Sequence, residues 1–243
     1  CDPKVLAGVI DRALELQRIL GSETLRRTVG RLGSLPAGLR VYQALTAALA
    51  DPEVEVRRLA GIVEADVAMA GRVLHFVNSA YYGLARKVAS IEEAIVFIGI
   101  STLRNLTLTL EVFSAFQVDG HASHFDELER HALLTARIAR DIVNDAGRAE
   151  AAFSAGLLHD CGKLVLIDRL PGPYAEARAL AAGTGRPDHL AEREVMGADH
   201  AEVGAYILGL WGLPHDIVEA VAFHHSEERL SRGTFDGVVA VGA

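Results

Sequence analysis

The stretch Ala151–Lys163, with the sequence AAFSAGLLHDCGK, is the part of the chain from which its fold and chemistry can be argued. Small and apolar residues recur in it at steps of three and four, a spacing that predicts a buried helix. Two potential metal ligands, His159 and Asp160, stand side by side near its end. Neighbouring residues of a helix point about 100° apart, so an imidazole nitrogen and a carboxylate oxygen can still reach one metal ion between them. A His-Asp pair is common by chance, so other residues have to support the site.

The remaining histidines are distributed unevenly along the chain. Of the 10 histidines, only His75 precedes residue 121. A predicted inward helix face combines His131 with Leu134, Thr135, Ile138 and Ile142. His224 lies on a second apolar stripe, and His200 opens a further predicted helix. One histidine in an apolar stripe is more often a hydrogen-bonded core residue than a ligand. Several of them around one His-Asp pair favour a shared polar pocket.

The composition predicts a helical protein and excludes some classes of partner. Of the 243 residues, 50% are hydrophobic and only 7 are prolines, which favours helices over a β-sandwich or barrel. The formal net charge of −8 argues against direct nucleic-acid binding, which depends on basic patches. No apolar run approaches the roughly 20 residues of a membrane span, so no membrane partner is predicted. Cys1 and Cys161 are far apart, which predicts reduced thiols in a cytoplasmic protein.

The first residues resemble the end of a different kind of domain. Asp2 and Pro3 suit the N-cap and the first position of an amphipathic helix. The segment is similar to the last helix of bacterial two-component receiver domains, with matches at Asp2, Pro3, Leu6, Ile10, Ala13, Leu14 and Leu16. This resemblance implies an upstream receiver domain in a longer protein. A generic linker helix is the alternative, and on either hypothesis residues 1–33 form a linker ahead of the main fold.

A second resemblance begins at Leu35 and extends to the end of the chain. Its most specific part combines Asn78-Ser79-Ala80-Tyr81 with Gly83, Ser90-Ile91, Ala94-Ile95 and Gly99. This long and irregular combination closely resembles the HDOD domain, an output module related to the HD phosphohydrolases. The resemblance implies an all-α fold, in which a helical N-terminal bundle packs on an HD-domain-like helical bundle. The polar segment QVDGHASH marks the predicted boundary, which gives subdomains 34–120 and 121–243.

The same resemblance implies a set of site residues. By their positions in the HD pattern, the metal ligands would be His131, His159, Asp160, His200, His224 and His225. Lys163 stands where related two-metal cyclic-dinucleotide phosphodiesterases keep a lysine, and it is the catalytic candidate if the chain is an enzyme. The implied cofactor is a divalent transition metal such as iron, manganese or zinc. Such a metal activates water and stabilises charge on a phosphate.

Two departures from the enzyme pattern argue against catalysis. The last helix of those enzymes carries a final Asp, whereas the apolar pattern VVAVGA puts Ala243, or a residue beyond it, at that position. Asp236 is too early in this helix to be a good substitute. The Gly-Tyr-Pro motif that follows the double histidine in the phosphodiesterases is absent from SEERLSRGTFDG, which occupies that place here. A site with fewer carboxylates is expected to hold a divalent metal less tightly.

These observations predict a signal-transduction output module of a bacterial response regulator that acts through binding rather than catalysis. Phosphorylation of the upstream receiver domain would expose or hide a surface for a protein partner of unknown identity. The alternative hypothesis is a metal-dependent phosphohydrolase or phosphodiesterase acting on a nucleotide or cyclic dinucleotide. An intermediate hypothesis is a pocket that binds a nucleotide ligand without hydrolysing it.

Overall fold

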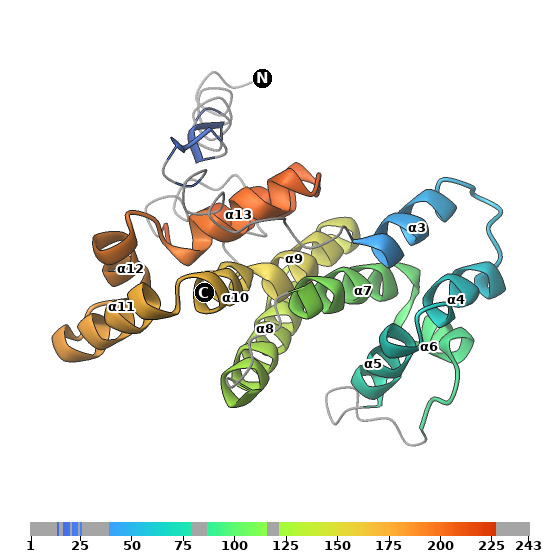
Figure 1. The fold of residues 1–243 in the computed structure, drawn as a ribbon. Helices are drawn as coiled ribbons and strands as arrows, with labels where there is room; N and C mark the ends of the chain where they lie inside the picture. The colour runs from blue at the N-terminus through green and yellow to red at the C-terminus, as the bar shows by residue number, and fades with distance from the viewer. Residues whose placement is uncertain are drawn as a thin grey trace. The chain divides into compact units, whose positions relative to one another are not determined.

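The described part of the chain is helical, as predicted. A computed structural model describes residues 14, 17–19, 21–23, 25, 39–78, 87–115 and 122–226. Within those residues there are helices and their connections but no strand, so the all-α prediction is confirmed (Figure 1). The chain divides into two compact units, which we call the α3–α7 unit (Pro36–Ala115) and the α8–α14 unit (Phe116–Ala243 together with Cys1–Leu35).

The α3–α7 unit is a small helical bundle. It comprises α3 (Arg40–Ala48), α4 (Val56–Glu64), α5 (Val67–Val77), α6 (Ile91–Ile98) and α7 (Ile100–Ala115). Helix α7 packs against α3, α5 and α6, and α6 also packs against α4 and α5. Leu45, Leu59 and Leu103 are completely buried in its core. Gly99 ends α6 with a φ of 83°, a backbone conformation that suits glycine, and α7 begins at the next residue.

Two side chains of this unit hold segments that are distant in the sequence. Glu111 of α7 accepts hydrogen bonds from the backbone N–H groups of Val41 and Tyr42, both at 2.9 Å, and so caps the first turn of α3. Asn78, from the motif that resembles HDOD domains, is the C-cap residue of α5, and its side chain is hydrogen-bonded to the backbone of Val88. Its amide donates to Val88 O at 2.8 Å, and its oxygen accepts from Val88 N at 2.7 Å. Residues 79–86 of the same motif lie outside the described residues.

The α8–α14 unit contains the histidine-rich half of the sequence. It comprises α8 (Ala122–Ile142), α9 (Ala146–Leu158), α10 (Cys161–Arg169), α11 (Pro171–Thr184), α12 (Asp188–Met196), α13 (His200–Leu210) and α14 (His215–Phe223). Helix α9 packs against α8 and α14, and α13 packs against α10 and α14. Helices α11 and α12 form a pair of their own (Figure 1). The buried helix predicted in the stretch 151–163 is present as α9, which ends at Leu158, and after His159 and Asp160 the chain continues as α10 from Cys161.

The prediction of the buried face of α8 is wrong. Leu134, Ile138 and Ile142 are 56%, 45% and 50% exposed, whereas α8 buries Ala132, Ala136, Ala139 and Val143. The reason is a close approach to α9, where a Cβ atom added to Gly156 would lie 2.6 Å from Ala136 Cα. Only small side chains fit between helices at such a distance, so the alanine face is the one that packs.

No described helix is long and apolar enough to cross a membrane by itself. Helices α6 and α7 meet the length and composition of a span only when taken together, across a bend of 115°.

Candidate metal centre

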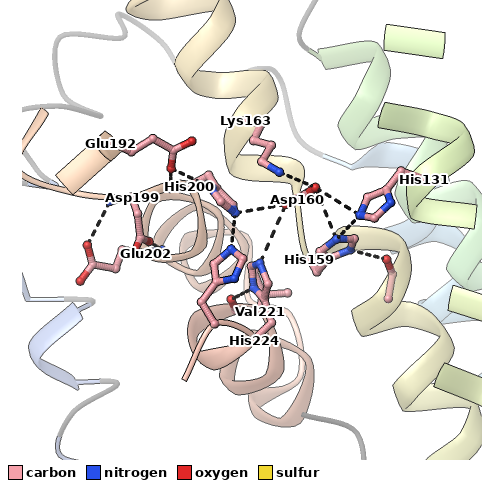
Figure 2. Close-up of polar contacts among 12 residues, drawn as sticks. His131, His159, Asp160, Lys163, Glu192, Asp199, His200, Glu202, Val221 and His224 are labelled. Atoms are coloured by element: carbon pink, nitrogen blue, oxygen red, sulfur yellow. Dashed lines mark hydrogen bonds and ion pairs between the residues drawn. The ribbon is translucent and has the colours of Figure 1, made fainter. Parts of the chain in front are cut away.

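The predicted His-Asp pair lies at the junction between two helices. His159 is the C-cap residue of α9, and Asp160 is the N-cap residue of α10. Both are buried, with exposures of 4% and 5%. His159 Nδ1 lies 2.7 Å from the carbonyl oxygen of Gly156, which accepts a hydrogen from it. The other ring nitrogen of His159, Nε2, faces Asp160 and His131 (Figure 2).

One oxygen of Asp160 faces a first cluster of ligand atoms. Asp160 Oδ2 lies 3.4 Å from His159 Nε2 and 3.7 Å from His131 Nε2. The two imidazole nitrogens are 3.1 Å apart. Lys163, one turn further along α10, places its Nζ 2.8 Å from the same oxygen. In the structure the ammonium group therefore balances the carboxylate on the side where His131 and His159 converge (Figure 2).

The other oxygen of Asp160 faces a second cluster. Asp160 Oδ1 lies 3.2 Å from His200 Nε2, at the start of α13, and 3.9 Å from His224 Nε2, at the end of α14. His225 follows directly, and its Nε2 lies 2.8 Å from His200 Nε2. His224 Nδ1 is 2.8 Å from the carbonyl oxygen of Val221, so this ring is oriented in the same way as that of His159. One carboxylate thus stands between two groups of imidazoles.

The charges of the site follow from burial and from these contacts. Burial by itself would raise the pKa of Asp160, but His159, His200 and Lys163 hold that pKa well below its ordinary value. Burial lowers the pKa of His224 well below its ordinary value, and His159 and His225 act in the same direction. Asp160 is therefore ionised and His224 neutral at physiological pH, which are the forms in which both side chains bind metals.

His200 differs from the other histidines because it lies between two carboxylates. Its Nδ1 is 2.6 Å from Glu192 Oε2, on the side of the ring opposite Asp160 (Figure 2). Burial opposes its positive charge, but the contacts with Asp160 and Glu192 raise its pKa to about 9. Without a metal ion, His200 is an imidazolium that holds two buried carboxylates together.

The ligand atoms fit a divalent metal ion by chemistry and by spacing. In each of two groups, His131 with His159 and Asp160, and His200 with His224 and His225, the ligand atoms all lie within 4.8 Å of one another. Bonds of about 2.0–2.3 Å to one central ion require separations of this size. Among the described residues, His224 Nε2 is buried without a hydrogen-bond partner, and Asp160 Oδ1 is buried with the ion pair to His200 at 3.2 Å but no hydrogen bond of good geometry. Buried polar atoms without partners are costly, and a cation between them would satisfy both.

All six predicted ligands and Lys163 therefore meet in one place, although whether they hold a metal stays a prediction. Asp236 and Ala243, the positions considered for a final carboxylate, lie outside the described residues. Two neighbours of the site were not predicted from the sequence. Glu192 contacts His200, and His189 stacks on His225 with ring centroids 4.1 Å apart. Both belong to the short helix α12, which carries none of the predicted ligands. No helical spacing therefore connected them with the site in the sequence.

The chain belongs to the HDOD domain family, whose model matches residues 35–227. The chain resembles an HDOD domain protein of unknown function from Geobacter sulfurreducens, with a TM-score of 0.75 and 25% identity over 90% of this chain and 74% of that one. A candidate phosphohydrolase from Shewanella amazonensis SB2B gives a TM-score of 0.71 and 25% identity, over 91% of this chain and 78% of that one.

Longer proteins contain the same region. An uncharacterized protein of Treponema pallidum (strain Nichols) is 24% identical over 229 residues, which is 93% of this chain but 44% of that protein. This chain thus spans less than half the length of that relative.

Proposed function

We propose that this chain is a signal-transduction output module whose α8–α14 unit binds divalent transition-metal ions at the two clusters joined by Asp160. The observation that carries the proposal is the division of one buried carboxylate between two groups of imidazoles. Imidazoles suit iron and zinc, which are borderline in hardness, and the carboxylate also suits the harder manganese ion. Such ions would supply the module with positive charge and Lewis acidity for a phosphate-bearing ligand.

The residues themselves prepare the site for metal and for an anion. His159 and His224 are held by backbone carbonyls with their Nε2 atoms turned toward Asp160. A buried, oriented ligand loses little conformational entropy on binding, which favours affinity. Lys163 Nζ pairs with Asp160 Oδ2 from the end of a long side chain, so it can turn to an anionic ligand when a metal takes over this oxygen.

Metal content is the direct test. Protein purified without a metal-affinity column should contain iron, manganese or zinc near stoichiometry by elemental analysis, and Asp160→Ala should lose it. Asp141→Ala is the matched control, because Asp141 is 61% exposed on α8. If the parent protein holds no metal and takes none up from added manganese, iron or zinc, the proposal is wrong.

Hydrolysis of a nucleotide or cyclic dinucleotide is a second candidate function. The position of Lys163, 2.8 Å from the shared carboxylate, favours it, because a cation there can neutralise charge on a phosphate. The likeness to a candidate phosphohydrolase, at 25% identity, points the same way. Metal-loaded protein should be assayed against a panel of nucleotides and cyclic dinucleotides. Turnover that requires Asp160 would support the enzyme, whereas binding without turnover would support the sensing module.

Control of the module by an upstream receiver domain is part of the proposal. Its support is the similarity of the first residues, from Asp2 and Pro3 onward, to the last helix of receiver domains. Most of this segment lies outside the described residues. In the longer parent protein, a beryllofluoride-activated receiver should change hydrogen exchange or partner capture in the HDOD region. An unchanged exchange pattern would contradict this coupling without affecting the metal site.

A further inference from the structure

Glu192 is buried beside His200, and it has no role in the metal set predicted from the sequence. Its side chain is 1% exposed. Glu192 Oε2 accepts a hydrogen bond from the backbone N–H of His200 at 2.8 Å and lies 2.6 Å from Nδ1 of the same residue. The second oxygen, Oε1, is buried and has no hydrogen-bond partner among the described residues. The hydrogen bonds found for this carboxylate therefore all go to His200.

The helix that carries Glu192 is held by tight packing. Ala191, its neighbour in α12, is fully buried against Ala177 and Ala181 of α11. Small residues in such a contact let two helices approach closely and leave little room for movement. Glu192 is therefore presented to His200 from a rigid helix pair, rather than from a mobile loop.

We propose that Glu192 is a positioning residue. Its carboxylate accepts a hydrogen bond from Nδ1–H of His200 and so keeps Nε2 available to a metal ion in the second cluster. This inference rests on the proposed metal-binding function. A neutral imidazole carries one hydrogen, and a hydrogen bond from Nδ1 leaves the lone pair on Nε2. His200 Nε2 points to Asp160 Oδ1 at 3.2 Å and to His225 Nε2 at 2.8 Å. A carboxylate behind a ligating histidine also makes it a stronger electron donor.

A purely structural role for Glu192 is the competing explanation. His200 is the first residue of α13, and a carboxylate is favourable at a helix N-terminus. That helix already has a capping box, in which Asp199 Oδ1 accepts from Glu202 N at 2.9 Å and Glu202 Oε2 accepts from Asp199 N at 3.2 Å. Glu202 therefore serves the start of the same helix, and none of its hydrogen bonds found here goes to the His200 ring.

This difference provides a matched control for the experiment. The dissociation constant for Zn²⁺ should be measured by competition with a chromophoric chelator for the parent protein, Glu192→Gln, Glu192→Ala and Glu202→Ala. Glu192→Ala is expected to weaken Zn²⁺ binding by about 10- to 100-fold, the usual effect of losing the partner of a ligating histidine. Glu192→Gln should lose less, because its amide oxygen can still accept from Nδ1. Glu202→Ala should bind as the parent does, and urea unfolding should show that each variant is folded.

A spectroscopic measurement separates positioning from helix capping. With histidine labelled with ¹⁵N, the Zn²⁺-loaded parent should show a downfield Nδ1–H resonance from His200, as expected for a donor 2.6 Å from a carboxylate. Glu202→Ala should keep this resonance, and Glu192→Ala should lose it. Equal Zn²⁺ affinity of the parent and Glu192→Ala, or equal losses of affinity in Glu192→Ala and Glu202→Ala, would overturn the inference about Glu192. Either result would leave the proposed metal-binding function standing. A parent protein that binds no metal would overturn the proposed function, and the inference with it.

Discussion

Gly162 of α10 lies directly against His200 of α13, so that a Cβ atom at position 162 would overlap the carbonyl oxygen of His200. The same added atom would lie 2.7 Å from Gly204 N. The two helices therefore meet backbone to backbone at the point where His200 is brought to Asp160. The glycine in HDCGK determines how close the two clusters come, although it carries no functional group.

Gly162→Ala should damage both the stability and the site. Because the overlap is with backbone atoms, α10 and α13 would have to move apart, and we expect a loss of about 3 kcal/mol or more in the free energy of unfolding. Urea denaturation and metal content measure the two effects. Gly183→Ala in α11 is the control, since a Cβ there meets nothing within 4 Å. That change should stabilise the protein by up to about 1 kcal/mol, and a Gly162→Ala variant as stable as the parent would contradict the contact.

The stability of the metal-free protein should depend on pH through His200. Its pKa is raised to about 9 in the folded state, against an ordinary value of about 6.5 in the unfolded chain. Because the pKa of His200 is raised by folding, its charge stabilises the fold fully at pH values below the unfolded-state pKa. This stabilisation is lost as the pH rises toward 9. The shift corresponds to a contribution on the order of 3 kcal/mol for a fully buried group. Urea unfolding at a series of pH values from 6 to 9.5 measures it.

A bound metal ion should remove the pH dependence of stability that His200 causes, and His215 provides a control histidine. Saturating Zn²⁺ would displace the Nε2 proton of His200, so the added stability from metal should grow with pH. His200→Gln should flatten the metal-free curve over the same interval. His215→Gln, at a side chain that is 57% exposed, should leave it unchanged. Metal-free parent protein that is equally stable at pH 6.5 and 9 would contradict the charged state assigned to His200.

Lys163→Met should strengthen metal binding and destabilise the metal-free protein. Lys163 Nζ competes for Asp160 Oδ2 from 2.8 Å, so its removal should tighten metal binding several-fold. The metal-free variant should be less stable than the parent, because a buried carboxylate loses its counter-charge. Isothermal titration with Mn²⁺ and thermal unfolding check the two effects. Lys87→Met, at an exposed position in the other unit, should change neither, and weaker Mn²⁺ binding by Lys163→Met would make the lysine a support of the metal site.

The α3–α7 unit offers a prediction that is independent of the metal. Glu111 caps α3 through Val41 N and Tyr42 N, where the N-cap residue Leu39 provides no side-chain acceptor. Glu111→Ala should lower the free energy of unfolding by about 1–2 kcal/mol, and Glu111→Gln should lose less because one acceptor remains. Chemical denaturation compares both variants with Glu92→Ala, whose side chain is 49% exposed. Equal stabilities for Glu111→Ala and Glu92→Ala would show that this cap contributes nothing.

The pattern of the site was accessible from the sequence because its residues stand at recognisable positions. His159 and Asp160 are adjacent, and His224 and His225 are adjacent, so each pair is visible in one dimension. The predicted helix start at His200 is likewise confirmed, because Asp199 caps α13 through a short-range hydrogen bond that depends only on nearby residues. Local rules of this kind also identified the chain as helical. Its membership of the HDOD family agrees with the irregular motif around Asn78.

The sequence by itself determined that the chain is helical and which helix ends carry the histidine and aspartate side chains of the site. Tertiary structure decided which face of α8 is buried, because the close contact of Gly156 with Ala136 admits alanines and leaves Ile138 exposed. It also decided that Glu192 lies behind His200. Periodicity describes how residues are arranged around one helix axis, but not which neighbouring helix approaches or how closely. That approach depends on the backbone contacts of small residues, which one-dimensional spacing does not contain.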